Sequence, residues 1–102
     1  ITDDQGLRLF NVFNFPNPFA LETQFSFEIS STAEVSVDIF TLGGRRVCQI
    51  SPQTVTAGYN FINWDGRDKY GDILANGVYL YRIKAKNGNE SISSIGKIAK
   101  YQ

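Results

Sequence analysis

Hydrophobic and polar residues alternate along most of this chain in short runs, which is the two-residue period of β-strands. The clearest run places Phe25, Phe27 and Ile29 between polar neighbours, and Val35, Val37 and Ile39 repeat the pattern. No segment of useful length has the 3.6-residue period of a helix. The pattern predicts strands over residues 7–14, 24–29, 35–42, 45–50, 59–64, 78–86 and 91–100.

Turn-forming residues separate these runs about every ten residues. Gly43-Gly44 and Asn87-Gly88 lie between apolar runs and predict two hairpins. Pro16 and Pro18 cannot donate to a sheet ladder, so Pro16-Asn17-Pro18 predicts a rigid corner, and residues 51–57, which include Pro52, predict a loop. Seven or eight short strands with such turns predict an all-β fold, an antiparallel β-sandwich of the immunoglobulin type.

The segment after Trp64 combines acidic residues with glycines before the next strand begins at Val78. Its aspartates can hydrogen-bond nearby amides and its glycines allow unusual backbone angles. We therefore interpret Trp64, Asp65, Gly66 and Asp68 as residues that fix the loop. A cation site is the alternative, but the acids fall three and four residues apart, unlike the alternate ligands of an EF-hand.

Composition argues against several classes of function. Ten basic and ten acidic residues give a formal net charge of zero, and no local cluster of Lys or Arg provides a nucleic-acid site. The chain has no histidine, which excludes a Ser-His-Asp or Cys-His arrangement within it, and we expect neither catalysis nor a cofactor. Cys48 is the single cysteine and is expected at a half-buried strand position.

The chain has 102 residues, a length typical of one domain, and no apolar run approaches the roughly 20 residues that span a bilayer. Because it contains no methionine and begins at Ile1, we expect a piece of a longer polypeptide. The polar residues 1–6 are interpreted as the end of a linker, and residues 7–102 as the domain. An upstream domain of the same polypeptide is then an expected partner.

Aromatic side chains offer a further alternative, a platform that binds a sugar or a peptide. Most of them follow the strand pattern and are better interpreted as core residues. The candidates are Tyr59, Trp64, Tyr70, Tyr79 and Tyr81.

Several motifs occur together at a characteristic spacing. Asn14-Phe15-Pro16-Asn17-Pro18-Phe19 comes first, followed by the run from Val37 to Val47 around Gly43-Gly44, and then by Ala57-Gly58. Trp64-Asp65-Gly66-Arg67-Asp68 and the run from Gly77 to Tyr81 complete the set. The chain resembles the immunoglobulin-like module of the flagellar hook-capping protein. It resembles more closely the C-terminal domains of surface proteins exported by the type IX secretion system of Bacteroidetes, especially the tail of gingipain-type cysteine proteases and the related sortase.

This resemblance implies a non-catalytic C-terminal domain that serves as a sorting and surface-targeting signal. Its implied partners are the outer-membrane translocon and the sortase or attachment machinery, and its implied location is secreted or on the cell surface. The positions that match the motifs of the family, and that the resemblance assigns to sorting or partner contact, are Pro16, Asn17, Pro18, Gly43, Gly44, Gly77, Tyr79, Lys97 and Lys100.

One departure keeps a second function open. Ordinary sorting domains usually lack the long loop that begins at Trp64-Asp65-Gly66-Arg67-Asp68, which the hook-cap module and the sortase-like tails share. The alternative is a structural module that spaces or packs neighbouring domains in a hook-cap or adhesin-type protein.

Overall fold

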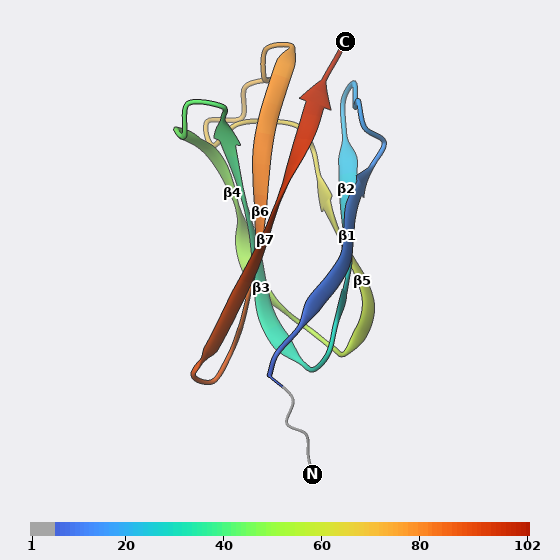
Figure 1. Ribbon diagram of the computed structural model, residues 1–102. Coiled ribbons are helices and arrows are strands. Elements are labelled where there is room, and N and C mark those ends of the chain that lie inside the picture. Colours follow the sequence, from blue (N-terminus) through green and yellow to red (C-terminus); the bar gives the residue numbers. More distant parts are fainter. Residues whose placement is uncertain (1–5) are drawn as a thin grey trace.

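The computed structural model describes residues 6–102 and contains seven strands arranged in two sheets (Figure 1). The expected linker end, residues 1–6, lies outside the described residues except for Gly6. The strands are β1 (Leu9–Phe15), β2 (Thr23–Ile29), β3 (Ala33–Thr41), β4 (Arg46–Val55), β5 (Gly58–Trp64), β6 (Gly77–Asn87) and β7 (Glu90–Lys100).

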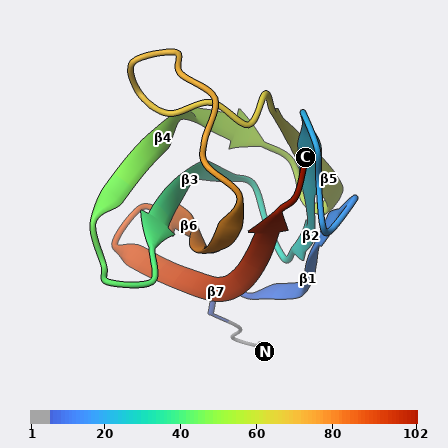
Figure 2. The ribbon, with the colours of Figure 1, turned by 90° about the horizontal axis from the view of Figure 1, so that it is seen from above.

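One sheet has the strand order β1-β2-β5 and the other the order β4-β3-β6-β7, and all pairs are antiparallel. The two sheets face each other and β7 lies beside β1 on one side of the sandwich, as the view from above shows (Figure 2). This architecture confirms the prediction of an all-β immunoglobulin-like sandwich.

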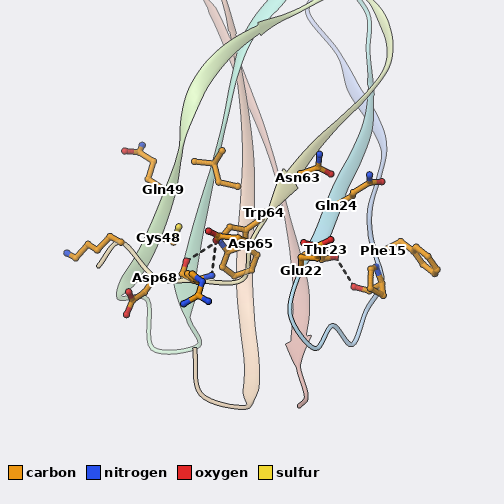
Figure 3. Close-up of a pocket in the computed structure, with 14 residues that line it drawn as sticks. Phe15, Glu22, Thr23, Gln24, Cys48, Gln49, Asn63, Trp64, Asp65 and Asp68 are labelled. Carbon is orange, nitrogen blue, oxygen red and sulfur yellow. Dashed lines mark hydrogen bonds between the residues drawn. The ribbon is translucent and has the colours of Figure 1, made fainter. Parts of the chain in front are cut away.

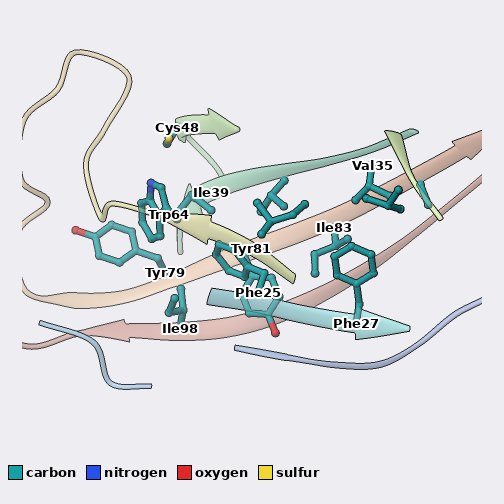
Figure 4. Packing of buried hydrophobic residues seen from close by; sticks show 14 of the residues in the cluster. Phe25, Phe27, Val35, Ile39, Cys48, Trp64, Tyr79, Tyr81, Ile83 and Ile98 are labelled. Atoms are coloured by element: carbon teal, nitrogen blue, oxygen red, sulfur yellow. The ribbon is translucent and has the colours of Figure 1, made fainter. Parts of the chain in front are cut away.

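The core lies between the sheets and is formed by the inward-facing half of each alternating strand (Figure 4). Phe25 is fully buried, with its ring centroid 4.9 Å from that of Tyr81 and 6.1 Å from that of Trp64. Tilted and stacked ring pairs at these distances stabilise the fold by more than the burial of their apolar area alone. The alternation in the sequence therefore indicated the buried faces of β2 and β3 correctly.

The prediction of a loop over residues 51–57 was wrong, because β4 continues to Val55. β4 is an edge strand, so Pro52 has no ladder bond to lose on the open side. The register also shifts between Val35 and Val37, whose partners are Gln53 and Ile50. The extra residue on β4 forms a β-bulge, which accommodates the proline.

Among residues 6–102 there is no helix long and apolar enough to cross a membrane.

Candidate functional site

The Pro16-Asn17-Pro18 corner contacts the end of β7, about eighty residues further along the chain. The side-chain Oδ1 of Asn17 accepts a hydrogen bond of 3.0 Å from the Ala99 amide, and its Nδ2 donates to the Lys97 carbonyl at 3.2 Å. The same Nδ2 also lies 3.2 Å from Oδ1 of Asn14. Asn17 thus extends the hydrogen bonding of β7 with a side chain.

The residue after the corner continues this contact with its backbone. The Phe19 amide donates to the Ala99 carbonyl at 2.9 Å, and the Tyr101 amide donates to the Phe19 carbonyl at 2.9 Å. These bonds form a short parallel bridge between Phe19 and Lys100. We call residues 16–20 together with residues 97–101 the terminal clamp.

Lys100 is enclosed by the terminal clamp and is only 2% exposed. Its Nζ donates to the Ala20 carbonyl and to Oε1 of Gln102, and it lies 5.7 Å from the centroid of the Phe19 ring. A buried ammonium needs such partners, because transferring an isolated charge out of water is costly. The carbonyl, the amide oxygen and the ring face together solvate this cation.

Gly77 and Tyr79 lie on β6 next to the terminal clamp, opposite Lys100 and Ile98 of β7. The Tyr79 hydroxyl donates to the Ala75 carbonyl at 2.7 Å, and its side chain is buried, which raises the pKa of the phenol. Tyr79 and Lys100 therefore support the fold from inside it, and neither presents its side chain for direct contact with a partner. Lys97, in contrast, is exposed.

Gly43 and Gly44 lie elsewhere, in the hairpin between β3 and β4. Gly44 has a φ of 95°, a value that favours glycine, and its amide donates to the Thr41 carbonyl at 2.9 Å. The hairpin follows Thr41 of β3, which pairs with Tyr79 of β6, so β6 lies between β3 and the strand of the terminal clamp, β7.

The residues from Trp64 onward form a loop with its own hydrogen bonds. Trp64 Nε1 donates to the Arg67 carbonyl at 3.1 Å, and Asp65 Oδ1 accepts from the Arg67 amide at 3.1 Å. Asp68 Oδ1 accepts from the amides of Tyr70 and Asp72 at 2.9 and 3.0 Å. These carboxylates therefore bond backbone amides within the loop.

Gly66 joins this loop to the terminal clamp. Its φ is 74°, and an added Cβ would lie 2.3 Å from the Leu21 carbonyl oxygen and 3.0 Å from the Phe19 ring. Only glycine allows the two segments to approach so closely. The loop thereby supports the chain segment that holds β7.

A groove of about 1060 Å³ opens beside this loop, between the β2–β5 side of one sheet and β4 of the other (Figure 3). Its wall mixes polar and apolar surface, with Gln24, Asn63 and Asp65 on one side and Cys48 and Gln49 on the other. Cys48 is a free, buried thiol, and burial raises its pKa. Within residues 6–102, no three His, Cys, Asp or Glu side chains gather as metal ligands.

The aromatic candidates for a binding platform do not form one surface. Trp64, Tyr79 and Tyr81 are between 4% and 9% exposed and belong to the core, as the strand pattern indicated, whereas Tyr59 and Tyr70 are more than 70% exposed on separate elements. The interpretation of these five residues as one binding platform was therefore wrong.

Sequence reasoning missed a charged cluster on the outer face of the four-stranded sheet. Asp38 is 2% exposed although it lies on the face opposite the core, and its oxygens lie 2.9 Å from Arg82 and 3.5 Å from Arg46. The register that places Asp38 beside Arg82 was the missing information, because charged residues on adjacent strands are not paired by pattern alone.

Comparison with known families identifies the domain. The sequence model of the FlgD Ig-like domain matches residues 16–89, which is most of the chain. This chain belongs to the FlgD Ig-like domain family. No curated protein sequence matches it.

Solved structures with this Ig-like fold include three informative relatives. Dimeric latent PorU from Porphyromonas gingivalis is 26% identical with a TM-score of 0.84, over 98% of this chain and 10% of that one. FlgD from P. aeruginosa is 17% identical with a TM-score of 0.67, over 95% and 78%. PorZ, a surface component of the P. gingivalis type IX secretion system, is 19% identical with a TM-score of 0.56, over 90% and 12%.

This chain spans about a tenth of the length of the PorU and PorZ chains that it matches. The comparisons therefore confirm the Ig-like fold and the resemblance to the hook-cap module. The chain is also similar to PorU and PorZ from P. gingivalis. The likeness to FlgD and PorZ, both below 20% identity, concerns the fold alone.

Proposed function

We propose that this chain is a non-catalytic C-terminal domain of a longer secreted surface protein, and that it acts as a type IX secretion sorting and surface-targeting signal. The observation that carries the proposal is the terminal clamp, in which the opening Pro-Asn-Pro motif and the last strand hold each other. The likeness to PorU, which covers 98% of the chain and so includes β7, supports it.

In this proposal the outer-membrane translocon and the attachment machinery bind one end of the folded sandwich. Pro16, Pro18 and Lys97 are exposed at that end and supply the contact surface. β7 is an edge strand, and edge strands can pair with an added strand of a partner. Since the backbone between Lys97 and Ala99 already bonds to the corner, strand addition would use the first half of β7.

The test is a fusion of residues 1–102 behind a signal peptide and a fluorescent reporter in a bacterium with type IX secretion. Deleting β7 would remove the buried side chains of Ile98 and Lys100, so a truncation would confuse unfolding with loss of a signal. Charge reversal at exposed Lys97 (K97E) avoids this, with K84E on β6 as a matched exposed control. We expect surface display of the intact fusion and of K84E, and reduced display of K97E.

Periplasmic retention of the intact, folded fusion would contradict autonomous sorting. Equal display of K97E and K84E would show that the translocon does not contact the end of β7 through Lys97.

The second candidate is a structural module that spaces neighbouring domains in a hook-cap or adhesin-type protein. Membership of the FlgD Ig-like domain family supports this function as well as it supports sorting. The fusion experiment separates the two, because a spacer that lacks sorting information would leave the reporter in the periplasm.

A further inference from the structure

The outer face of the three-stranded sheet carries five exposed aromatic side chains. They lie on β1 and β5, the two strands that flank β2, and all are between 40% and 75% exposed. We call this surface the aromatic face, and its members are Phe10, Phe13, Phe15, Tyr59 and Phe61. Sequence patterns did not predict this surface, because its residues come from the two edge strands of the sheet, which are distant in the chain.

Strand register arranges these rings in two columns. Phe13 and Phe61 both pair with Ser26, and the next row has Glu28 between two rings. Adjacent strands are about 4.8 Å apart, so the columns are separated by roughly 10 Å. Gln24, Ser26 and Glu28 of β2 therefore form a polar strip between the two columns of rings.

A β-bulge in β1 assembles one of these columns. Between Phe10 and Phe13 the register shifts, so that Asn11 and Val12 oppose a single residue of β2. Asn11 has a φ of 51°, a left-handed conformation that non-glycine residues seldom adopt. Without the extra residue, Phe10 and Phe13 would point to opposite faces of the sheet, since their spacing is odd.

The area of the aromatic face is large for a surface in contact with water. With about 200 Å² for each aromatic side chain, the exposed fractions correspond to roughly 600 Å². That equals the upper end of the largest patch on a typical monomer, about 300–600 Å². The polar strip of β2 brings the face toward the roughly 800 Å² per partner of a stable interface, with the apolar excess that homodimers show.

Charge favours a second copy over a charged ligand. The formal net charge of the chain is zero, so two copies do not repel each other. Glu28 is the acidic residue in the polar strip, and its carboxylate already accepts a hydrogen bond from Nδ2 of Asn11. A hydrogen bond to Glu28 and the negative charge of Glu28 also raise the pKa of Tyr59.

We propose that the aromatic face is a self-association surface, through which two copies of this chain pair face to face around a two-fold axis. Rings of one copy pack against the rings and the polar strip of the other, and the same patch is used on both sides. This inference does not depend on the sorting function.

The test is sedimentation equilibrium of the chain, residues 1–102, from about 5 to about 500 µM. We expect a monomer–dimer equilibrium within this range, since interfaces of this size reach micromolar affinity or better. The double variant F13S/F61S removes the two central rings and should raise the dissociation constant at least about 30-fold. The control L42S/I95S removes two side chains of similar exposure, one from the β3–β4 hairpin and one from β7, and should leave the constant unchanged.

Urea unfolding of each variant shows whether it is folded before its association is compared. A chain that stays monomeric at 500 µM would overturn the proposal and would assign the face to a neighbouring domain of a longer polypeptide. A dimer that F13S/F61S leaves intact would also overturn it. Amide chemical shifts that change on dilution should belong to β1, β2 and β5, and changes confined to the other sheet would contradict the face-to-face arrangement.

Discussion

Replacing Gly66 with alanine tests the contact between the Trp64 loop and the terminal clamp. The new Cβ would lie 2.3 Å from the Leu21 carbonyl oxygen and 3.0 Å from a carbon of the Phe19 ring. A backbone oxygen cannot rotate away as a side chain can, so the segment from Phe19 to Leu21 must shift. That segment bonds to β7, and the shift should therefore loosen the clamp.

The expected loss of free energy of unfolding in G66A has two parts. A residue with a side chain costs about 1–2 kcal/mol in the left-handed region, and Gly66 has a φ of 74°. Overpacking a well-packed site costs about 1–3 kcal/mol more. We expect G66A to lower the free energy of unfolding by about 2–5 kcal/mol.

Gly71 provides a matched control in the same loop. Its φ is 87°, but no heavy atom lies within 4 Å of an added Cβ. G71A should therefore lose only the backbone part, about 1–2 kcal/mol. The difference between the two variants measures the clash itself.

Urea unfolding followed by the fluorescence of Trp64, the single tryptophan, measures both losses. Hydrogen exchange locates the effect, because the Tyr101 amide donates to the Phe19 carbonyl and should exchange faster in G66A than in G71A. Equal losses in the two variants, with unchanged exchange at Tyr101, would refute the close packing of Gly66 against Leu21.

Three further predictions follow from other contacts. N17A removes the two hydrogen bonds to the backbone of β7, at about 1 kcal/mol each, and should lower the free energy of unfolding by about 1–2 kcal/mol and speed exchange of the Ala99 amide. G96A would place a Cβ 2.6 Å from the buried Tyr81 ring, and should cost about 1–3 kcal/mol in urea unfolding. Burial raises the pKa of Cys48 above its ordinary value of 9.0, so the folded chain keeps the thiol proton longer than the unfolded chain does. The stability from this source is complete below pH 9 and is lost as the pH rises through the folded-state pKa, which urea unfolding at pH 7, 9 and 10 measures.

Each of these has a control on the same protein. N63A changes an exposed asparagine of β5 and should stay within about 0.5 kcal/mol of the wild type. G43A meets no atom closer than 3.8 Å, and a loss equal to that of G96A would contradict the clash with Tyr81. C48A should show a weaker fall in stability between pH 9 and 10 than the wild type, and an identical fall would assign the effect to other groups.

Most strands could be predicted from the sequence because the apolar positions of each alternating run are the positions that the sheets bury. Phe25, Phe27 and Ile29 face the core as expected, and Gly43-Gly44 and Asn87-Gly88 close the predicted hairpins. The end of β4 was missed because a proline normally interrupts a strand. A strand can contain a proline when it lies at the edge of a sheet and has a β-bulge there, as β4 does. Both conditions depend on which strands become neighbours in the fold.

The candidate site was predicted as a set of motif residues, without their arrangement. Asn17 and Ala99 are far apart in the sequence, and no local pattern shows that a side-chain amide bonds β7. Tyr79 and Lys100 were expected at a contact surface but lie inside the fold, since the terminal clamp and the Tyr79–Ala75 hydrogen bond bury them.

By itself, the sequence determined the class of fold, the positions of most turns and the family, because these depend on the local period of hydrophobic residues and on a few glycines and prolines at set spacings. The tertiary structure decided which of these residues meet. Register and sheet order brought Asn17 to β7, placed Gly66 against Leu21, and gathered rings from β1 and β5 on one face. Such contacts join segments that are distant in the chain. They are determined by how the strands and loops pack together, which the local sequence pattern does not specify.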